Sequence, residues 1–424
     1  MTKYKALFCA FFLLSFIGTT NAQTSTNSPY TRYGFGQLSD QNFGNSIAMG
    51  GISYGLRNGL QVNASNPASY SAVDSLTFIF DFGMSLQNTN FQEGSVKTNA
   101  KNSTVDYIAM QYRLYDRMGM SIGFLPYSNV GYTMMRTNNV TADNSNESIT
   151  SATQSFSGEG GLQQVYVGLG YKLLDNFSIG ANFSYLYGTI THTVGTIFNN
   201  SSAFSSSRSH RISVNDYKLD FGLQYTQKLG EKRKINIGAV YSLGHDLNST
   251  GYEYVQKYTN SGSIATQTVD TIPDAFAIPH TYGAGITYVY DDRLTIGVDY
   301  TLQKWQDAKF FNEKGAFENR TKIAMGAEYL PNPLSNNLLK RIRYRAGAYY
   351  SSPYAKVNGN EGNKEYGVSF GFGLPVIRSK SILNISGQYV KVTPKIKGML
   401  EETYLRINVG LTFNERWFMK WKVD

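Results

Sequence analysis

The sequence predicts an all-β protein, a transmembrane antiparallel β-barrel of about fourteen strands with an N-terminal plug, or hatch, in its lumen. Three observations support this fold class: the composition, a period-two alternation of apolar and polar residues, and connections that alternate between long and short. The same observations divide the chain into residues 1–22 as a signal peptide, residues 23–75 as the plug and residues 76–424 as the barrel.

The composition excludes several classes of protein. The 424 residues include 41 Gly, 32 Tyr and 25 Phe, with 41% hydrophobic and 16% charged residues. A helical transporter needs several stretches of about 20 apolar residues, and a disulfide scaffold needs more than the single Cys found here. Disordered chains have few aromatic residues, and soluble enzymes usually carry about 25% charged residues. The net charge of +9 comes without a basic cluster containing aromatic residues, so no nucleic-acid partner is predicted.

The first residues predict export. Lys3 and Lys5 form a basic region, the residues from Ala6 to Ile17 are apolar, and Thr20-Asn21-Ala22 provides a small-residue cleavage site. This order is typical of a secretory signal peptide, and the apolar stretch is too short for a membrane-spanning helix. An N-terminal anchor helix is the alternative. Cys9 lies inside the apolar stretch without the context of a lipoprotein signal, so we expect no lipid anchor.

From about residue 76 onward, apolar and polar residues alternate, as they do in a strand with two unlike faces. In the last such segment Leu405, Ile407, Val409, Leu411 and Phe413 alternate with polar or small residues. No comparable run has the period of a helix. The segments begin near Leu76, Val105, Gly119, Leu162, Phe177, Val214, Lys234, Tyr282, Leu294, Thr321, Ile342, Lys364, Ser381 and Tyr404.

The connections between these segments alternate in length. Long polar links span residues 88–104, 129–161, 195–212, 244–281, 304–320 and 351–363, whereas residues 116–118, 175–176, 230–233, 291–293 and 375–380 form short turns. Long loops on one side and short turns on the other are typical of a bacterial outer-membrane barrel. We therefore expect a barrel in the cell outer membrane, in contact with outer-membrane lipid, with both termini on the periplasmic short-turn side. Tyr288, Tyr300 and Tyr389 lie near strand ends and fit interfacial aromatic belts.

Residues 23 to about 73 differ from the rest of the mature chain, because Gly and Pro punctuate them and alternation is weak. A barrel of about fourteen strands is too wide for its own side chains to fill. We therefore expect these residues to fold into the lumen as a plug. A periplasmic tail is the alternative.

Several short motifs resemble a known family. Ala48-Met49-Gly50-Gly51, followed by the plug motif Asn66, Pro67 and Ala68 before the first strand, is similar to the N-terminal region of the FadL/TodX/OMPP1 outer-membrane transporters. The opening from Ser28 to Gly34 resembles a Bacteroidetes branch of that family, and Leu125-Pro126-Tyr127 resembles a Pro-aromatic pair in its third strand. The resemblance implies a fourteen-stranded barrel with an N-terminal hatch. It also implies that hydrophobic molecules enter from outside and leave sideways into the bilayer beside a kinked third strand.

The third strand contains a residue that disturbs pairing. Pro126 has no N–H to donate to a β ladder, so it predicts a local break or bulge. We expect Pro126, Tyr127 and Ser128 to frame a lateral opening. The alternative is a Pro near the strand end, after pairing has finished. Unbroken hydrogen bonding on both sides of residues 122–130 would argue against an opening.

Charged residues fall on the faces predicted to point inward. Lys322, Glu328, Arg343, Arg345 and Glu365 are expected to form a lumen charge cluster across three neighbouring strands. Such a cluster usually joins the barrel wall to its plug, because buried charges must be paired. A ligand carboxylate bound by Arg343 or Arg345 is the alternative, since guanidinium groups suit it. A charged lumen argues against purely apolar substrates.

Other signals carry no site. Two G-x-S-x-G matches, at residues 51–55 and 119–123, lie in the plug and within a strand, whereas a nucleophile elbow needs a strand-to-helix turn. The four His residues lie in or near the long links without metal-ligand spacing. The sequence therefore predicts no enzyme activity, no metal site and no cofactor.

Two functions remain. The first is a channel or transporter for hydrophobic or amphiphilic small molecules. The second is a non-transporting subunit or docking platform of an outer-membrane secretion or assembly complex. The aromatic residues from Trp417 to Val423 follow the last strand and are expected to anchor at the membrane interface, with contact to a partner as the alternative.

Overall fold

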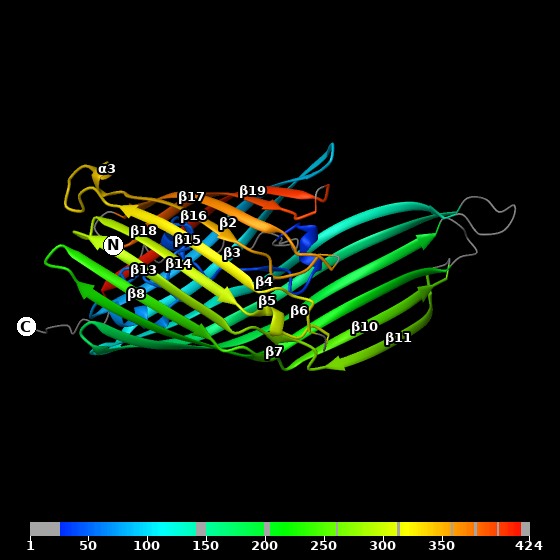
Figure 1. Ribbon diagram of the computed structural model, residues 1–424, viewed down its shortest axis with the longest axis horizontal. Helices are drawn as coiled ribbons and strands as arrows, with labels where there is room; N and C mark the ends of the chain where they lie inside the picture. Colours follow the sequence, from blue (N-terminus) through cyan, green and yellow to red (C-terminus); the bar gives the residue numbers. More distant parts are fainter. Residues whose placement is uncertain are drawn as a thin grey trace, which may run out of the picture.

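The computed structural model describes residues 26–140, 150–198, 204–259, 262–311, 314–357, 359–376, 380–396 and 398–416, and it shows a closed antiparallel β-barrel (Figure 1). The predicted signal peptide and the segment from Trp417 to Val423 lie outside the described residues. The barrel has the fourteen strands predicted from the sequence. In chain order the barrel strands are β2 (Thr77–Glu93), β3 (Val96–Tyr115), β4 (Met118–Val140), β5 (Thr150–Leu174), β6 (Phe177–Phe198), β7 (Ser205–Lys228), β8 (Arg233–Ser242), β13 (Thr281–Tyr290), β14 (Leu294–Gln303), β15 (Arg320–Tyr329), β16 (Arg343–Ser351), β17 (Lys364–Pro375), β18 (Ile382–Thr393) and β19 (Glu401–Arg416).

The barrel closes because its first and last strands pair. β19 pairs with β2 in an unbroken register from Arg416, opposite Thr77, to Glu401, opposite Gln92. β8 and β13, which a long connection separates in the sequence, pair along their whole lengths. Closure removes the edge strands, so the backbone N–H and C=O groups of the wall have partners within the sheet.

Side chains alternate between an apolar outer face and a small or polar inner face. On β19, Leu405 and Ile407 are exposed on the outside, whereas Asn408 and Thr412 are buried inside. Strands β8 and β13 to β16 have nine or ten residues, which is the length of a strand that crosses a hydrocarbon layer. The alternation and strand lengths define a transmembrane barrel. No helix among the described residues combines the length and the apolar character needed to cross a membrane.

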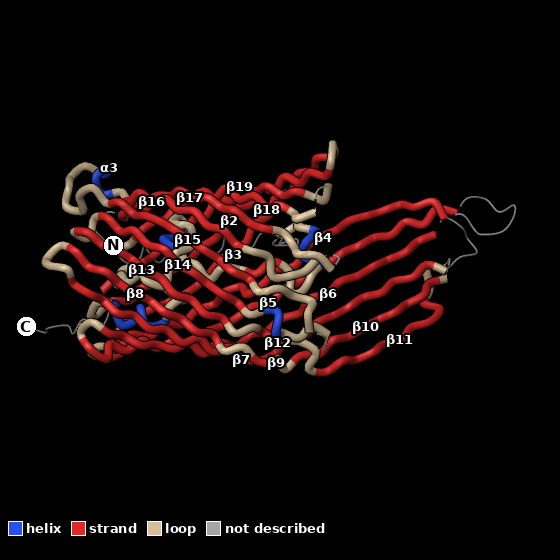
Figure 2. The backbone as a smooth tube through the Cα atoms, viewed as in Figure 1, coloured by secondary structure: helices blue, strands red, loops and turns tan. Residues whose placement is uncertain are grey.

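Several strands continue past the rim of the barrel. The parts of β4 to β7 that extend beyond the long-loop rim, together with β10 (Ser249–Tyr258) and β11 (Ile264–Pro273), form one projecting sheet (Figure 2). Residues 88–104, 129–161 and 195–212 were expected as loops, and that prediction was wrong for most of them. These stretches carry Ser, Thr and Asn on both faces, so the alternation that signals a strand is absent although the backbone still pairs with its neighbours.

The long connection from β8 to β13 also holds short elements. β9 (His245–Asp246) pairs with β12 (Ala277–Ile278) as a separate two-stranded ribbon beside β10 and β11. The connection from β14 to β15 contains η3 (Trp305–Asp307), and the one from β15 to β16 contains α3 (Leu338–Arg341). The connections from β8 to β13 and from β14 to β15 place several large aromatic side chains over the long-loop end of the lumen, whereas α3 lies at the short-turn end (Figure 1).

Residues 26–76, the N-terminal segment, lie inside the lumen. The segment contains η1 (Pro29–Arg32), β1 (Gln37–Leu38), α2 (Gly44–Ile47) and η2 (Pro67–Ala72). β1 pairs with β4 from the inside, and η2 packs against β5, β6 and β7. Short elements joined by glycine-rich turns follow from a sequence without a sustained period.

The N-terminal segment runs from one end of the barrel to the other. Ser28 Oγ donates to Glu402 Oε1 over 2.5 Å at the long-loop end. Asn414 Nδ2 donates to Leu60 O over 3.3 Å near the short-turn end. The first described residues therefore lie at the long-loop end and Arg416 at the short-turn end. The two chain ends lie outside the described residues, so their periplasmic orientation stays a prediction.

A ring of glycines lets this segment touch the wall. At each of these positions an added Cβ would lie between 1.8 and 2.5 Å from an atom of the N-terminal segment, so only glycine allows such a close approach. The glycine ring therefore brings the segment against seven of the fourteen barrel strands. Its members are Gly119, Gly170, Gly180, Gly222, Gly238, Gly326 and Gly347, on β4, β5, β6, β7, β8, β15 and β16.

Replacing Gly347 with Ala tests the glycine ring. The new Cβ would lie 2.2 Å from the backbone of Met49 and Gly50, so the segment or the wall must shift. Overpacking of this kind typically costs about 1–3 kcal/mol. We expect a lower unfolding midpoint in urea and faster proteolysis of the N-terminal segment for the purified variant. Gly387→Ala is the matched control, because an added Cβ there meets no atom within 4 Å. Equal behaviour of the two variants would contradict the close packing.

Candidate functional site

The plug motif fastens the N-terminal segment to the wall. Asn66 caps η2: its Oδ1 accepts from the N–H of Ala68 over 3.2 Å, and its Nδ2 donates to Tyr54 O over 2.8 Å. The same Nδ2 donates to Leu223 O of β7 over 3.1 Å. Pro67 starts the helix, where its missing N–H is not needed. The motif is thus a buried turn that ties the segment to itself and to the wall.

The predicted lumen charge cluster separates into distinct groups. Glu328 accepts from Arg343 over 2.7 Å and from Arg345 over 2.6 Å, and Arg345 also donates to Asn384 over 2.6 Å. Arg345 is 1% exposed. Both cations are therefore engaged with a carboxylate of the neighbouring strand. This group joins the wall to itself by ion pairs, and Gln61 of the N-terminal segment donates to Asn384 over 3.3 Å.

Lys322 and Glu365 lie apart from that group. In the antiparallel register both residues lie opposite Ser351, at the other end of β16 from Arg345. Glu365 accepts from the hydroxyls of Tyr349 and Tyr404 over 2.5 and 3.1 Å. The expectation of one cluster across three strands was wrong, because residues at the two ends of neighbouring strands cannot meet across a barrel wall.

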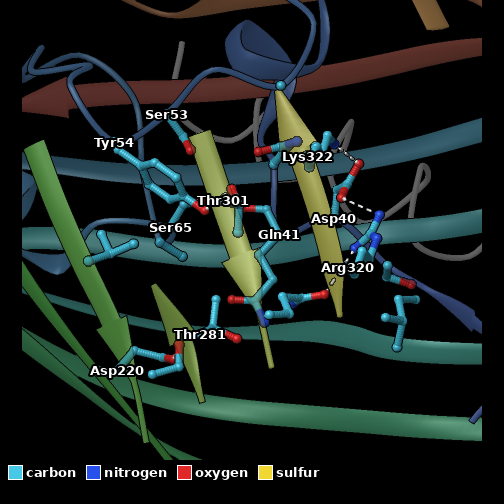
Figure 3. Close-up of a pocket in the computed structure, with 18 of the residues that line it drawn as sticks. Asp40, Gln41, Ser53, Tyr54, Ser65, Asp220, Thr281, Thr301, Arg320 and Lys322 are labelled. Carbon is cyan, nitrogen blue, oxygen red and sulfur yellow. Dashed lines mark hydrogen bonds and ion pairs between the residues drawn. The ribbon is translucent and has the colours of Figure 1, made fainter. Parts of the chain in front are cut away.

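Lys322 joins the wall to the N-terminal segment. Its Nζ lies 2.5 Å from Asp40 Oδ2 and 4.4 Å from the centre of the Tyr349 ring. Arg320 lies two residues earlier on the same strand, and its Nη2 is 3.9 Å from Asp40 Oδ1 (Figure 3). Burial alone would raise the pKa of Asp40, but the charges of Lys322 and Arg320 outweigh it and hold the pKa below its ordinary value.

A second carboxylate binds the segment from the wall. Asp299 of β14 accepts from the backbone N–H groups of Ser53 and Tyr54 over 2.5 and 2.8 Å. The sequence gives no sign of this partner. Asp40 was missed altogether, because it lies where alternation is weak. The only available signal was the need of Lys322 for a counter-ion inside the lumen.

These charges line polar cavities around the N-terminal segment. One cavity, of about 130 Å³, lies between the segment and strands β7 to β15, with Asp40, Asp220, Thr281 and Lys322 in its wall (Figure 3). Another, of about 90 Å³, lies on the opposite side and includes Arg406. Arg320 and Asp40 border both cavities. At mid-height, the described part of the lumen therefore presents hydrogen-bond donors and acceptors, unlike a pocket that binds hydrocarbon.

The ladder between β3 and β4 ends early. Pairing stops at Ile108, opposite Phe124, although both strands continue toward the long-loop end. On the other side of β4, pairing with β5 continues but shifts register between Pro126 and Ser128, so Tyr127 forms a bulge. The structure thus leaves Pro126, Tyr127 and Ser128 without partners on β3. A cavity of about 820 Å³ opens at this β3–β4 gap, and Thr104 and Pro126 line it.

Beyond the polar cavities, the long-loop end is closed by an aromatic cluster. Phe35 of the N-terminal segment lies at its centre, with Phe276, Trp305, Phe310 and Phe317 around it. Phe35, Phe276 and Trp305 are 0% exposed. Sequence analysis missed this cluster because its members come from separate loops. Among the described residues no three His, Cys, Asp or Glu side chains converge as a metal site.

The closed fourteen-strand barrel matches solved FadL/TodX-type barrels in fold. The Pseudomonas putida toluene transporter TodX aligns with a TM-score of 0.59 at 14% identity, over 90% of this chain and 100% of that one. The CymD monoaromatic hydrocarbon channel aligns with a TM-score of 0.57 at 13% identity, over 92% and 99%. A Pseudomonas aeruginosa FadL homologue aligns with a TM-score of 0.58 at 12% identity, over 88% and 98%.

Sequence similarity identifies the family. The family model described as BamG matches residues 1–424, so the chain belongs to the BamG family. None of the curated proteins matches the sequence. At these low identities the solved structures establish the fold, which confirms the predicted barrel.

Replacing Arg345 with Met tests the buried ion group. Glu328 would keep Arg343 as its single cationic partner inside the wall. Removing one partner of a buried ion pair typically costs about 3–5 kcal/mol. We expect a clear fall in the urea midpoint, measured by gel mobility of the folded barrel. Arg113→Met is the control, because Arg113 pairs with Asp116 at the surface. A fall in the urea midpoint no larger than that of Arg113→Met would contradict the assignment of Arg345 to a buried ion group.

The pKa of Asp40 predicts an acid dependence. Because the folded state lowers this pKa below about 3.8, the ion pair stabilises the protein at neutral pH, and this contribution is lost as the pH falls through the lowered value. We expect Asp40→Asn to unfold more easily than wild type at pH 7, with a smaller difference at about pH 3. Asp74→Asn, in an exposed pair with Lys380, controls for general charge removal. A difference that is constant with pH would contradict the role of Asp40.

Proposed function

We propose that this protein is an outer-membrane channel or transporter for hydrophobic or amphiphilic small molecules, which leave sideways through the β3–β4 gap. The observation that carries the proposal is the early end of pairing at Phe124, together with the cavity that opens there. Elsewhere the strand neighbours of the barrel pair around the circumference. A molecule leaving at the gap would break no pairing between β3 and β4, although it would have to pass β1, which pairs with Ser128 and Asn129 of β4.

The height of the gap suits release into lipid. Ile108 and Val105 are exposed and apolar on the outer face of β3, whereas Lys101 and Lys97 follow toward the long-loop end. The gap thus begins where the apolar outer belt ends. Unpaired backbone groups above this level can bind water, so an opening there avoids the cost of orphaned amides in hydrocarbon. A molecule that leaves the gap would meet the outer edge of the bilayer.

The neighbours in fold support the same class of cargo. Those neighbours are a toluene transporter and a monoaromatic hydrocarbon channel. The polar cavities beside Asp40 and Arg406 favour an amphiphile over a purely apolar molecule, because hydrocarbon does not satisfy these groups. The proposal involves passage of the cargo and no chemical step.

The chain organisation completes this proposal. Residues 1–22 would direct export, residues 23–75 would act as the plug, and residues 76–424 would form the barrel. The short-turn end, where Thr77 and Arg416 pair, would face the periplasm and the projecting sheet would face outward. Membership of a Bacteroidetes branch remains a prediction from the resemblance of residues 28–34.

A docking platform in an outer-membrane complex is the second candidate, and the projecting sheet favours it. Its last strand, β11, pairs on one side with β10, and its residues are exposed almost throughout. An edge of this kind is able to pair with a strand of another protein. Purification from native membranes in mild detergent separates the candidates: stoichiometric partner proteins would support the platform, and a bound lipid-like molecule would support transport.

A cysteine in the gap tests lateral release. The chain has one Cys, within the predicted signal peptide, so Thr104→Cys would provide a single thiol on the mature protein. Alkylation with a bulky maleimide would fill the gap lined by Thr104. We expect uptake of a labelled amphiphile by intact cells to fall at least about tenfold, roughly a 1.4 kcal/mol barrier.

Thr266→Cys on the exposed strand β11 is the matched control, since its thiol is labelled far from the gap. Uptake by the labelled control should equal that of wild type. Full uptake by the alkylated Thr104→Cys protein would show that cargo takes another route.

A further inference from the structure

One connection at the short-turn end exposes several large apolar side chains. Residues 330–342, which join β15 to β16 and contain α3, are called the leucine loop below. Leu334 is 91% exposed, more than any other large apolar side chain among the described residues. Leu338 and Leu339 are 50% and 63% exposed. Single exposed apolar residues are common on proteins, whereas several on one short loop mark a surface that interacts with something else.

Hydrogen bonds within the leucine loop hold its shape. Asn332 N donates to Lys340 O over 2.7 Å and so joins the two arms of the loop. Asn337 caps α3, because its Oδ1 accepts from Leu339 N over 2.9 Å. At the base of the loop, Leu330 is only 4% exposed. The loop thus buries one leucine against the barrel and leaves the other three in solvent.

The leucine loop is attached to the lipid-facing surface of the barrel. Tyr344 of β16 lies opposite Tyr329 of β15 and opposite Phe372 of β17. The rings of Tyr344 and Phe372 lie 5.7 Å apart, and Tyr329 is 51% exposed. A row of aromatic residues at one end of the apolar outer face is the interfacial belt of a membrane barrel. The Tyr344 hydroxyl donates to Leu339 O over 3.0 Å, so this belt carries α3 directly.

This hydrogen bond sets the level of α3 relative to the membrane. The tyrosines of an interfacial belt place their rings toward the hydrocarbon and their hydroxyls among the headgroups. The backbone of α3 therefore lies at headgroup level, within reach of the acyl chains for a leucine side chain. Figure 1 shows the loop with α3 beyond the outline of the barrel wall at the short-turn end. The loop thus extends beside the barrel, where the membrane surface lies.

The charge of the leucine loop indicates which lipids suit it. Residues 330–342 contain no Asp or Glu, whereas Lys340 and Arg341 follow the leucines directly. A backbone hydrogen bond joins the base of the loop to the neighbouring turn at Arg293. The two acids of that turn form ion pairs with Arg293 and Lys234. Basic residues next to exposed apolar ones are typical of segments that lie in the interface of an anionic membrane.

We propose that the leucine loop is a membrane anchor: its exposed leucines insert into the lipid leaflet at the short-turn end, and Lys340 and Arg341 bind the phosphates of anionic phospholipids. Because α3 is hydrogen-bonded to the aromatic belt, the anchor holds this side of the barrel at a fixed depth. The inference requires a transmembrane barrel and is independent of any cargo.

A fluorophore on the loop measures insertion. The single Cys lies in the predicted signal peptide, so Leu334→Cys gives the mature protein one thiol for an NBD label. The purified protein is placed in vesicles of phosphatidylcholine and phosphatidylglycerol, with quenchers either as bromine on the acyl chains or as iodide in the water. We expect bromine to quench this label at least about threefold more than a label on Glu231→Cys, and iodide to quench it less.

Glu231→Cys is the matched control, because Glu231 is exposed in the short turn between β7 and β8. Both labels lie at the same end of the barrel, so the orientation of the protein in the vesicles affects them equally. Leu338→Cys is a second position in the loop and should behave like Leu334→Cys. Equal iodide quenching of the loop and control labels would overturn insertion.

A charge variant tests the lipid preference. In one lipid mixture, bromine is placed either on phosphatidylglycerol or on phosphatidylcholine. We expect brominated phosphatidylglycerol to quench the Leu334→Cys label about twofold more, and Lys340→Gln with Arg341→Gln to abolish this preference. Lys97→Gln with Lys101→Gln removes the same charge at the long-loop end and should leave the preference unchanged. A preference that the loop variant does not lower would overturn phosphate binding.

A protein partner is the alternative cover of the leucine loop. In native membranes, a photoactivated crosslinker on Leu334→Cys should react with lipid and leave the protein at its own mass in a gel. A stoichiometric crosslink to one protein would overturn the membrane anchor and show that a partner covers these leucines.

Discussion

Hydrocarbon offers no hydrogen-bond partner to a peptide group, and this constraint decides the architecture of the molecule. The wall meets it by pairing β19 with β2 and β8 with β13, which leaves no edge at the level of the apolar belt. The β3–β4 ladder ends at Ile108, and the outer face of β3 changes from apolar Val105 to Lys101 a few residues beyond this pair. The wall is therefore open where water, rather than lipid, can satisfy the backbone.

Closure with an apolar outer face dictates the character of the interior. Every second residue must point inward, and those residues cannot form an ordinary hydrophobic core without losing the contrast between the two faces. The N-terminal segment solves this problem mainly through backbone approach at the glycine ring and through hydrogen bonds such as those of Asp299. Charges remain inside, and Glu328 and Asp40 neutralise the nearby cations.

The sequence predicts the strands in which apolar and polar residues alternate. It does not predict contacts that depend on strand register, or strands that are polar on both faces. All barrel strands were predicted, because lipid and lumen impose unlike faces on residues such as Leu405 and Asn408. The projecting sheet was missed because both of its faces are wet and carry similar residues. Pro126 could be read as a disturbance of pairing, since the missing N–H is a property of the residue itself.

Contacts between residues far apart in the chain could not be predicted from the sequence, for a physical reason. Lys322 and Arg345 lie on neighbouring strands, but which residue faces which depends on turn lengths such as the connection holding α3. Asp40 and Phe35 belong to a segment without a period, so neither position nor direction could be assigned.

One stretch of the N-terminal segment connects the aromatic cluster, the polar cavities of the lumen and the β3–β4 gap. Phe35 lies in the aromatic cluster, β1 pairs beside the bulge of β4, and Asp40 binds Lys322. The rest of the segment is held by the glycine ring together with the hydrogen bonds of Asn66 and Asp299. The upper part is instead held by a few separable interactions, each with a different chemistry. An aromatic contact, a strand pairing and an ion pair therefore hold this stretch independently of the glycine contacts.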